Sequence, residues 1–286
     1  MSSSDNNNEW DVVRMLEWGT DYFREKGVPS PRLSMEWILS DVLKIRRLDL
    51  YLAFDRPLTC RELDAVRPMV KRRAEHEPLQ YITGTADFHQ LTLRVTPDVL
   101  IPRPETEELV ERILEDHPPD TARTFLDIGT GSGCIALAVK KARPQWEVTA
   151  IDLSEKALEI ARQNARENRL DVAFVHTPFE PWKPGRNWDI IASNPPYIHE
   201  NEIPDLAEQV IKYEPRNALI TEDIVDIYRR LADFCETFLT PGGSFYFEIN
   251  EAHGEALLKT CGEKALKCRL AKDYSNKDRF ITGVRS

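Results

Sequence analysis

The first 85 residues place their apolar side chains at helical spacing. Val12, Leu16 and Phe23 recur on one face of a stretch that Gly27 ends. Thr59 precedes Glu62 by three residues, the spacing of a capping box that opens a helix. Further helices are expected, so that the set covers residues 10–26, 30–43, 49–54 and 59–75. This pattern predicts a small helical domain over residues 1–85, which serves either to recognise a partner or to support the structure.

The pattern changes after residue 85. Phe88, Leu91 and Leu93 are spaced as in short strands, and Thr96-Pro97-Asp98 is typical of a turn. We therefore predict a β-hairpin linker over residues 86–105 that turns at residues 96–98. Pro104 is suited to the first position of the helix that follows.

From residue 106 onwards, apolar strand patterns alternate with amphipathic helix patterns. The expected strands cover residues 124–128, 147–152, 172–176, 189–193, 244–249, 268–272 and 279–284. The expected helices lie between them, at residues 134–141, 155–167, 224–239 and 252–261. Such alternation predicts an α/β, Rossmann-like domain over residues 106–286, with a mostly parallel sheet and an antiparallel end. Ligands bind such sheets at the carboxyl ends of the strands.

Composition and charge argue against several classes of function, among them DNA binding, membrane insertion and metal binding. The net charge is −10, and nearly all of this excess lies after residue 85, so the chain does not favour direct binding to duplex DNA. No apolar run approaches the ~20 residues of a membrane helix. Residues 1–8 are polar, lack a signal pattern and are expected to be disordered, which indicates a cytoplasmic protein. The five cysteines show no CxxC spacing and the histidines no HExxH, so we expect no metal site.

A glycine-rich loop follows the first strand of the α/β domain. The segment Asp127-Ile128-Gly129-Thr130-Gly131-Ser132-Gly133 lets a ligand lie against bare backbone. It lacks the spacing of a dinucleotide fingerprint and the GK[ST] of a P-loop. An acid such as Asp127 beside the turn suits a cationic ligand, and Asp152, about 20 residues downstream, suits ribose hydroxyls. These features predict a site for S-adenosylmethionine, with S-adenosylhomocysteine as the product.

The tetrapeptide Asn194-Pro195-Pro196-Tyr197 follows the fourth strand. Two prolines make this loop stiff, because each fixes its own φ and restricts the preceding residue. We expect the Asn194 side-chain oxygen and the Pro195 carbonyl to accept the two hydrogens of a planar NH2 group, while Tyr197 covers its flat face. A rigid turn without chemistry is the alternative for the tetrapeptide alone.

These motifs together resemble the HemK/PrmC family of class I methyltransferases, which methylates release-factor glutamine. The resemblance rests on the loop of residues 127–133, the Ile151-Asp152-Leu153-Ser154 strand end, residues 194–198 and the linker string Leu100-Ile101-Pro102-Arg103-Pro104-Glu105-Thr106-Glu107. It covers nearly the whole chain, and the linker string is its most specific part.

The resemblance implies a substrate and a set of site residues. The substrate is the glutamine of the Gly-Gly-Gln loop of peptide chain release factors, whose methylation tunes translation termination. Asn194 and Pro195 then grip the amide and Tyr197 packs on it, with Pro196 in the same substrate site. Arg103, just before the predicted helix, is expected at the mouth of this site, and the alternative for it is an incidental charge pair with Glu105 at the helix start. The cofactor contacts are expected from Asp127, Gly129, Thr130, Gly131, Ser132, Gly133, Asp152, Leu153, Pro178, Phe179 and Asn194.

The chain departs from the family pattern at two places. Residues 177–179 read Thr-Pro-Phe, so either Pro178 or Phe179 has to contact adenine. Residues 217–223 are shorter than the glycine-containing loop expected there, so the rim of the pocket is expected to differ from the family pattern while the chemistry does not.

Two rival functions remain. The exocyclic amine of adenine in nucleic acid is also planar and conjugated, so the same tetrapeptide would suit an adenine methyltransferase that flips its base. A non-catalytic binding module of the same fold is the other alternative. We expect a monomer.

Overall fold

The computed structural model describes residues 10–286, and the disorder expected for residues 1–8 falls outside them. The chain forms two compact units. One contains the chain up to Gly84 together with residues 207–213, and the other contains residues 85–206 and 214–286. The hairpin that we expected to be a linker therefore belongs to the second unit, and the first unit includes a short segment from late in the sequence.

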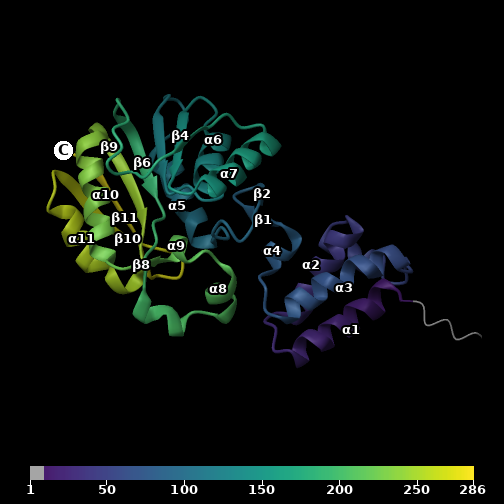
Figure 1. The fold of residues 1–286 in the computed structure, drawn as a ribbon. Coiled ribbons are helices and arrows are strands. Elements are labelled where there is room, and N and C mark those ends of the chain that lie inside the picture. The colour runs from purple at the N-terminus through teal and green to yellow at the C-terminus, as the bar shows by residue number, and fades with distance from the viewer. Residues whose placement is uncertain (1–9) are drawn as a thin grey trace, which may run out of the picture. The chain divides into compact units, whose positions relative to one another are not determined.

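The first unit is helical (Figure 1). Its helices are α1 (Val12–Glu25), α2 (Pro31–Leu43), η1 (Arg47–Leu52), α3 (Cys60–Ala74), α4 (Leu79–Thr83) and α8 (Glu208–Tyr213). The predicted capping box of α3 is confirmed, since Thr59 and Glu62 exchange side-chain and backbone hydrogen bonds. The late segment joins this unit through Tyr213, whose hydroxyl donates to the Glu75 carbonyl at 2.8 Å.

A hairpin opens the second unit, but its turn is not where the sequence indicated. Strands β1 (Thr85–Phe88) and β2 (Leu91–Arg94) pair antiparallel, and the chain reverses at His89 and Gln90. Both turn residues have positive φ, 43° and 64°. Residues 96–98 do form a turn, in which the Val99 amide donates to the Thr96 carbonyl at 3.0 Å, but this turn follows β2 and does not join the two strands. The hairpin turn itself was predicted at the wrong place, because neither His89 nor Gln90 is a residue type that signals such a turn.

A seven-stranded sheet forms the centre of the second unit, in the order β10-β11-β9-β6-β3-β4-β5. Its strands are β3 (Thr124–Ile128), β4 (Glu147–Asp152), β5 (Ala173–His176), β6 (Trp188–Ser193), β9 (Leu239–Glu248), β10 (Leu266–Lys272) and β11 (Asp278–Arg285). All neighbouring pairs are parallel except those that involve β11. The expected parallel sheet with an antiparallel end is thus confirmed.

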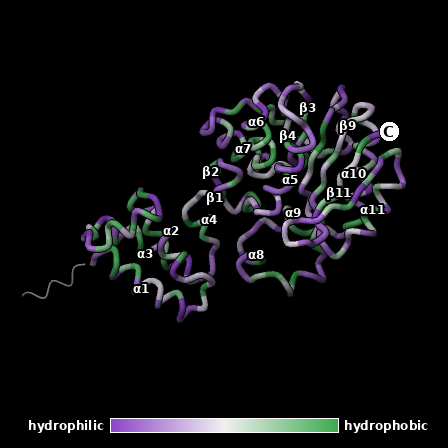
Figure 2. The backbone as a smooth tube through the Cα atoms, turned by 180° about the vertical axis from the view of Figure 1, so that it is seen from behind, coloured by the Kyte–Doolittle hydropathy of each residue, from purple (hydrophilic) through white to green (hydrophobic). Residues whose placement is uncertain are grey.

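Helices cover both faces of this sheet (Figure 1). On one face, α5 (Pro104–Asp116), α6 (Cys134–Ala142) and α7 (Glu155–Asn168) bury Leu109, Leu137 and Ala165 against the strands. On the other, α10 (Ile224–Phe238) and α11 (Gly254–Gly262) bury Leu231 and Leu257. The strands are largely hydrophobic (Figure 2), and neighbouring residues such as Phe125 and Leu126 are buried in different cores, as a parallel sheet between two helical layers requires.

Short elements complete the second unit. They are β7 (Ile198–His199), η2 (Glu200–Asp205), α9 (Arg216–Leu219), β8 (Ile220–Thr221) and η3 (Glu251–His253). Strand β7 pairs with β8 in a separate two-stranded sheet, so the segment after the Asn194 tetrapeptide is tied to the segment that precedes α10. Within residues 10–286, none of the helices combines the length and apolarity needed to cross a bilayer.

Candidate active site

The strand order reverses between β3 and β6, and a cavity of the second unit lies there. From β3 the chain moves outward through β4 to β5 and then returns to place β6 on the other side of β3. Such a reversal leaves a crevice at the carboxyl ends of the two strands. The cavity has a volume of about 340 Å³ and is lined mainly by apolar atoms. Gly129, Asp152 and Asn194, from three separate strand ends, all line it.

The glycine loop lines one wall of the cavity. Gly129, Gly131 and Gly133 all have positive φ, and an added Cβ at Gly129 or Gly131 would meet no atom within 4 Å. These two positions therefore leave open space next to the backbone. The amides of Gly129 and Thr130 donate to the Ile151 carbonyl at 2.9 and 3.0 Å, which ties the loop to the end of β4.

Asp152 supports the same loop from the neighbouring strand. Its Oδ2 accepts from the Gly131 amide and its Oδ1 from the Ser154 amide, both at 2.8 Å. Each carboxylate oxygen has further lone pairs, so Asp152 retains acceptors for a pair of ligand hydroxyls. Leu153, the next residue, also lines the cavity and is 70% exposed.

Asp127 lies beneath the loop and is not among the residues that line the cavity. Its Oδ2 accepts from the Thr130 hydroxyl at 2.6 Å and from the Ala136 amide at 3.3 Å. Its Oδ1 is buried and has no hydrogen-bond partner among the described residues. Burial raises the pKa of Asp127 from 3.8 to about 7. A nearby cation would favour the ionised form, so this carboxyl suits a positively charged ligand above the loop.

Apolar side chains also line the cavity. Pro178 and Phe179, which the sequence left as alternatives for an adenine contact, both line the cavity. Three residues of α10 that the sequence analysis missed, Ile227, Arg230 and Leu231, line it as well. The Arg230 guanidinium lies 5.2 Å from the centre of the Phe179 ring. Helix amphipathicity indicated only that α10 packs on the sheet, so nothing in the sequence marked its role at the cavity.

Three residues of the tetrapeptide after β6, Asn194, Pro195 and Pro196, line the cavity. The Asn194 Nδ2 donates to the Thr106 hydroxyl at 3.1 Å. Across residues 10–286, neither the Asn194 Oδ1 nor the Pro195 carbonyl oxygen accepts a hydrogen bond. Two acceptors are therefore available at the position where the sequence predicted that an NH2 group is held.

Tyr197 lies differently from its expected position. It does not line the cavity, its side chain packs against the hydrophobic core that includes Tyr228 and Phe247, and its hydroxyl donates to the Glu248 carboxylate at 3.1 Å. Burial raises the pKa of Tyr197 well above 10, so the hydroxyl stays protonated. The contacts seen here hold the tetrapeptide in place, and its stacking on a substrate amide stays a prediction.

Arg103 lines the cavity, and its charge is balanced. Its Nη2 lies 2.6 Å from Oε1 of Glu214, whose side chain is 1% exposed. The Ile101 amide also donates to this carboxylate at 3.4 Å. Glu214 was missed because it lies 111 residues from Arg103 in a polar loop that carries no motif.

The cavity fits S-adenosylmethionine. The open space at Gly129 and Gly131 admits the amino-acid end, the unpartnered Oδ1 of Asp127 lies below it, and Asp152 offers acceptors for ribose. The apolar lining suits an adenine ring. Among the residues that the structure describes, no group of three or more His, Cys, Asp or Glu side chains is arranged to hold a metal.

Comparison with known proteins agrees with this geometry. The family model of the PrmC N-terminal domain matches residues 14–84, and that of the methyltransferase small domain matches residues 105–222. The chain is similar in fold to a methyltransferase from Pyrococcus furiosus (TM-score 0.52, 19% identity), with 68% of this chain and 89% of that one covered.

The similarity in sequence extends over nearly the full length. A release factor glutamine methyltransferase from Geobacter sulfurreducens is 41% identical over 96% of both chains. One from Rhodopirellula baltica is 37% identical over 99% of both chains. Since identity of this degree spans both units, the present chain belongs to the release factor glutamine methyltransferase family.

Proposed function

We propose that this protein transfers a methyl group from S-adenosylmethionine to the side-chain amide nitrogen of the glutamine in the Gly-Gly-Gln motif of peptide chain release factors. Relatives that carry this activity in their names match both units of the chain. The fit of the cavity to S-adenosylmethionine supports the methyl donor.

One observation carries the proposal at the level of chemistry. The Asn194 amide is held at its nitrogen end by Thr106, so its Oδ1 and the adjacent Pro195 carbonyl are left as a pair of acceptors. A primary amide presents two N–H donors in one plane, and two acceptors can hold both. The stiff Pro195-Pro196 backbone keeps the pair in place.

Positioning is the main catalytic task. An amide nitrogen is a poor nucleophile, because its lone pair is delocalised into the carbonyl group. When bound, S-adenosylmethionine supplies the methyl group, and its sulfur keeps the electron pair of the broken bond as the nitrogen lone pair forms the new one. Asn194 and Pro195 hold the amide hydrogens and so direct the lone pair, and well-oriented reactants gain roughly 7–11 kcal/mol. One amide proton then leaves to water, so no general base is assigned.

A methylation assay tests the function. The purified protein is incubated with labelled S-adenosylmethionine and a purified release factor, and mass spectrometry locates the added methyl. We expect one methyl on the glutamine of the Gly-Gly-Gln motif and none on a release factor with alanine at that position. A methyl on any other residue, or label only in adenine-containing DNA supplied in parallel, would overturn the proposal.

The proposal extends to partners and location. We infer a cytoplasmic monomer that contacts neither DNA nor membrane, with the helical first unit binding the body of the release factor. The exposed aromatic residues Trp18 and Trp37 of that unit, 44% and 38% exposed, are available for such a contact.

A further inference from the structure

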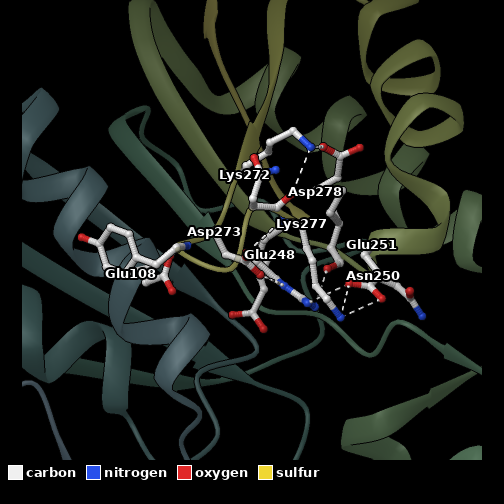
Figure 3. Close-up of polar contacts among 12 residues, drawn as sticks. Glu108, Glu248, Asn250, Glu251, Lys272, Asp273, Lys277 and Asp278 are labelled. Atoms are coloured by element: carbon white, nitrogen blue, oxygen red, sulfur yellow. Dashed lines mark hydrogen bonds and ion pairs between the residues drawn. The ribbon is translucent and has the colours of Figure 1, made fainter.

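Glu248 is a fully buried carboxyl group that the proposed function leaves without a role. It ends β9, is 0% exposed and does not line the cavity. Figure 3 shows it beside polar side chains at the ends of the last strands, among them Asp273 and Asn250. Burying a carboxylate is costly unless hydrogen bonds compensate for the lost water. Its partners therefore indicate what it does.

Two hydroxyl groups donate to this carboxylate. The Thr106 hydroxyl donates to Oε2 at 2.7 Å, and the Tyr197 hydroxyl donates to Oε1 at 3.1 Å. Tyr197 belongs to the tetrapeptide, and Thr106 lies in the first turn of α5, 142 residues away from Glu248 in sequence. One carboxylate thus joins three segments of the second unit next to the Asn194 amide.

The hydrogen-bond direction at Thr106 fixes the orientation of Asn194. A threonine hydroxyl has a single hydrogen, and here it is given to Glu248. The hydroxyl oxygen can then only accept, which it does from the Asn194 Nδ2 at 3.1 Å. The nitrogen end of the amide is thereby turned toward Thr106, and Oδ1 is left for the cavity.

We propose that Glu248 is a positioning residue that acts through Thr106 to keep the Asn194 oxygen, rather than its NH2 group, facing the substrate amide. The inference rests on the proposed function and adds to it the reason why Asn194 presents an acceptor. Glu248 does not touch the reacting atoms.

Protonation of Glu248 would reverse the direction of the hydrogen bonds that link Glu248, Thr106 and Asn194. A protonated carboxyl can donate to Thr106, whose hydrogen then turns toward Asn194. The Asn194 amide then presents its NH2 group to the NH2 end of the substrate amide, which offers no acceptor there. Burial raises the pKa of Glu248 from 4.5 to about 7, which places this change in an accessible range. The groups that face Glu248 are Thr106 and Glu105 of α5, Tyr197, Tyr228 of α10, Cys134 of α6 and Arg279 of β11.

Two substitutions at Thr106 test whether Glu248 acts on Asn194 through this hydroxyl. Thr106→Val removes the hydroxyl with little change in shape, and Thr106→Ser keeps it. We expect Thr106→Val to lower kcat for release-factor methylation by about tenfold, the worth of one hydrogen bond to a charged group. The affinity for S-adenosylmethionine, measured by calorimetry, should stay within about threefold, which also shows that the variant is folded. Thr106→Ser should recover most of the wild-type kcat.

The pH profile separates positioning from a merely structural role. At saturating S-adenosylmethionine, the wild-type kcat/KM should rise between pH 6 and 8 with a midpoint near 7, as Glu248 ionises. Glu248→Gln cannot ionise, so its profile should lack this step, and Thr106→Val should flatten it. A flat wild-type profile, a step that persists in Glu248→Gln, or full activity of Thr106→Val would each refute the inference.

The two proposals fail in different ways. If the wild-type protein methylates no release factor at any pH, the proposed function is wrong. If it does so while Thr106→Val keeps both its kcat and its pH step, the function stands and only the role of Glu248 is wrong. Should Thr106→Val not fold, the profiles of the wild type and Glu248→Gln decide the question.

Discussion

At the scale of single residues, Asn194 does two things at once. Its nitrogen is bound by Thr106 within the protein, and its oxygen is left for a ligand. Replacement with alanine removes the acceptor without disturbing the glycine loop, which is held by Ile151 and Asp152. Asn194→Ala should therefore affect the chemical step rather than cofactor binding.

We predict that Asn194→Ala lowers kcat for release-factor methylation by at least ~100-fold, equivalent to about 2.7 kcal/mol of transition-state stabilisation. Calorimetry should find the affinity for S-adenosylmethionine within a few-fold of wild type. Asn168→Ala is the matched control, because that amide bonds to backbone carbonyls of Thr92 and Asn164 away from the cavity. Near-normal turnover of Asn194→Ala would remove this side chain from the mechanism.

The opposite pattern is expected at Asp152. Its carboxylate orders the loop through the Gly131 and Ser154 amides and keeps acceptors for ribose, so its loss affects the bound cofactor first. Asp152→Ala should weaken S-adenosylmethionine binding by at least ~10-fold, as expected for lost hydrogen bonds to a charged group. Glu159→Ala, an exposed acid on α7, controls for the change in charge. Calorimetry that finds equal affinity in both variants would contradict the ribose assignment.

Residues that belong to a local motif were predictable from the sequence, whereas the residues that hold them in position through hydrogen bonds were not. Asn194, Asp152 and the glycines stand in strings whose chemistry is apparent from neighbouring residues alone. Thr106 and Glu248 meet only because α5 packs against the end of β9, which no spacing indicates. An acid in the apolar run of residues 244–249 was the one available signal, since a charge at the end of a buried strand needs a partner.

At the scale of elements, the regular strands were predicted closely because each is a short apolar run between polar segments. Strands β3 and β4 match their expected bounds, residues 124–128 and 147–152. The hairpin turn was misplaced, because the turn at His89 and Gln90 uses positive φ without glycine or asparagine. Tertiary contact compensates here, since the Glu107 carboxylate accepts from the His89 amide at 2.9 Å.

The glycine loop also depends on close packing between α6 and α7. An added Cβ at Gly133 would lie 3.1 Å from Leu137 Cδ1 and 3.2 Å from Ala161 Cβ, whereas Gly131 has open space. Both have positive φ, so alanine is strained at either position.

We predict that Gly133→Ala destabilises the second unit by ~2–4 kcal/mol, and Gly131→Ala by about 1 kcal/mol, since only the former adds steric overlap to backbone strain. Urea denaturation is followed by tryptophan fluorescence, in which the buried Trp146 and Trp188 of this unit should shift on unfolding more than the exposed Trp18 and Trp37 of the first unit. Equal losses of stability in the two variants would show that packing against Ala161 does not explain the glycine at position 133.

At the scale of the whole molecule, the chain order and the structural units do not coincide. Residues 207–213 belong with the helical unit, although the residues on both sides of them belong with the sheet. Periodicity could not reveal this, because the assignment depends on contacts such as that of Arg73 Nη1 with Gln209 Oε1 at 3.3 Å.

Net charge distinguishes between the two candidate substrates of the Asn194 tetrapeptide, the glutamine amide of a protein and the exocyclic amine of adenine in nucleic acid. An adenine methyltransferase has to bind a polyanion, which requires several phosphate contacts from Lys and Arg. This protein has a net charge of −10, and at the cavity Arg103 is paired with Glu214 and Arg230 with Glu180. These pairs leave little positive charge for a phosphate backbone near the tetrapeptide.

We therefore predict that adenine-containing single-stranded DNA neither accepts methyl groups nor competes with a release factor, even at the lowest salt at which the protein is soluble. Electrostatic repulsion should keep competition weakest at low salt, where a DNA-binding protein would bind best. Methyl transfer is measured with labelled S-adenosylmethionine across a salt series, with an oligonucleotide that lacks adenine as control. Inhibition that appears at low salt and disappears at high salt would reveal a phosphate-binding surface and favour the adenine substrate.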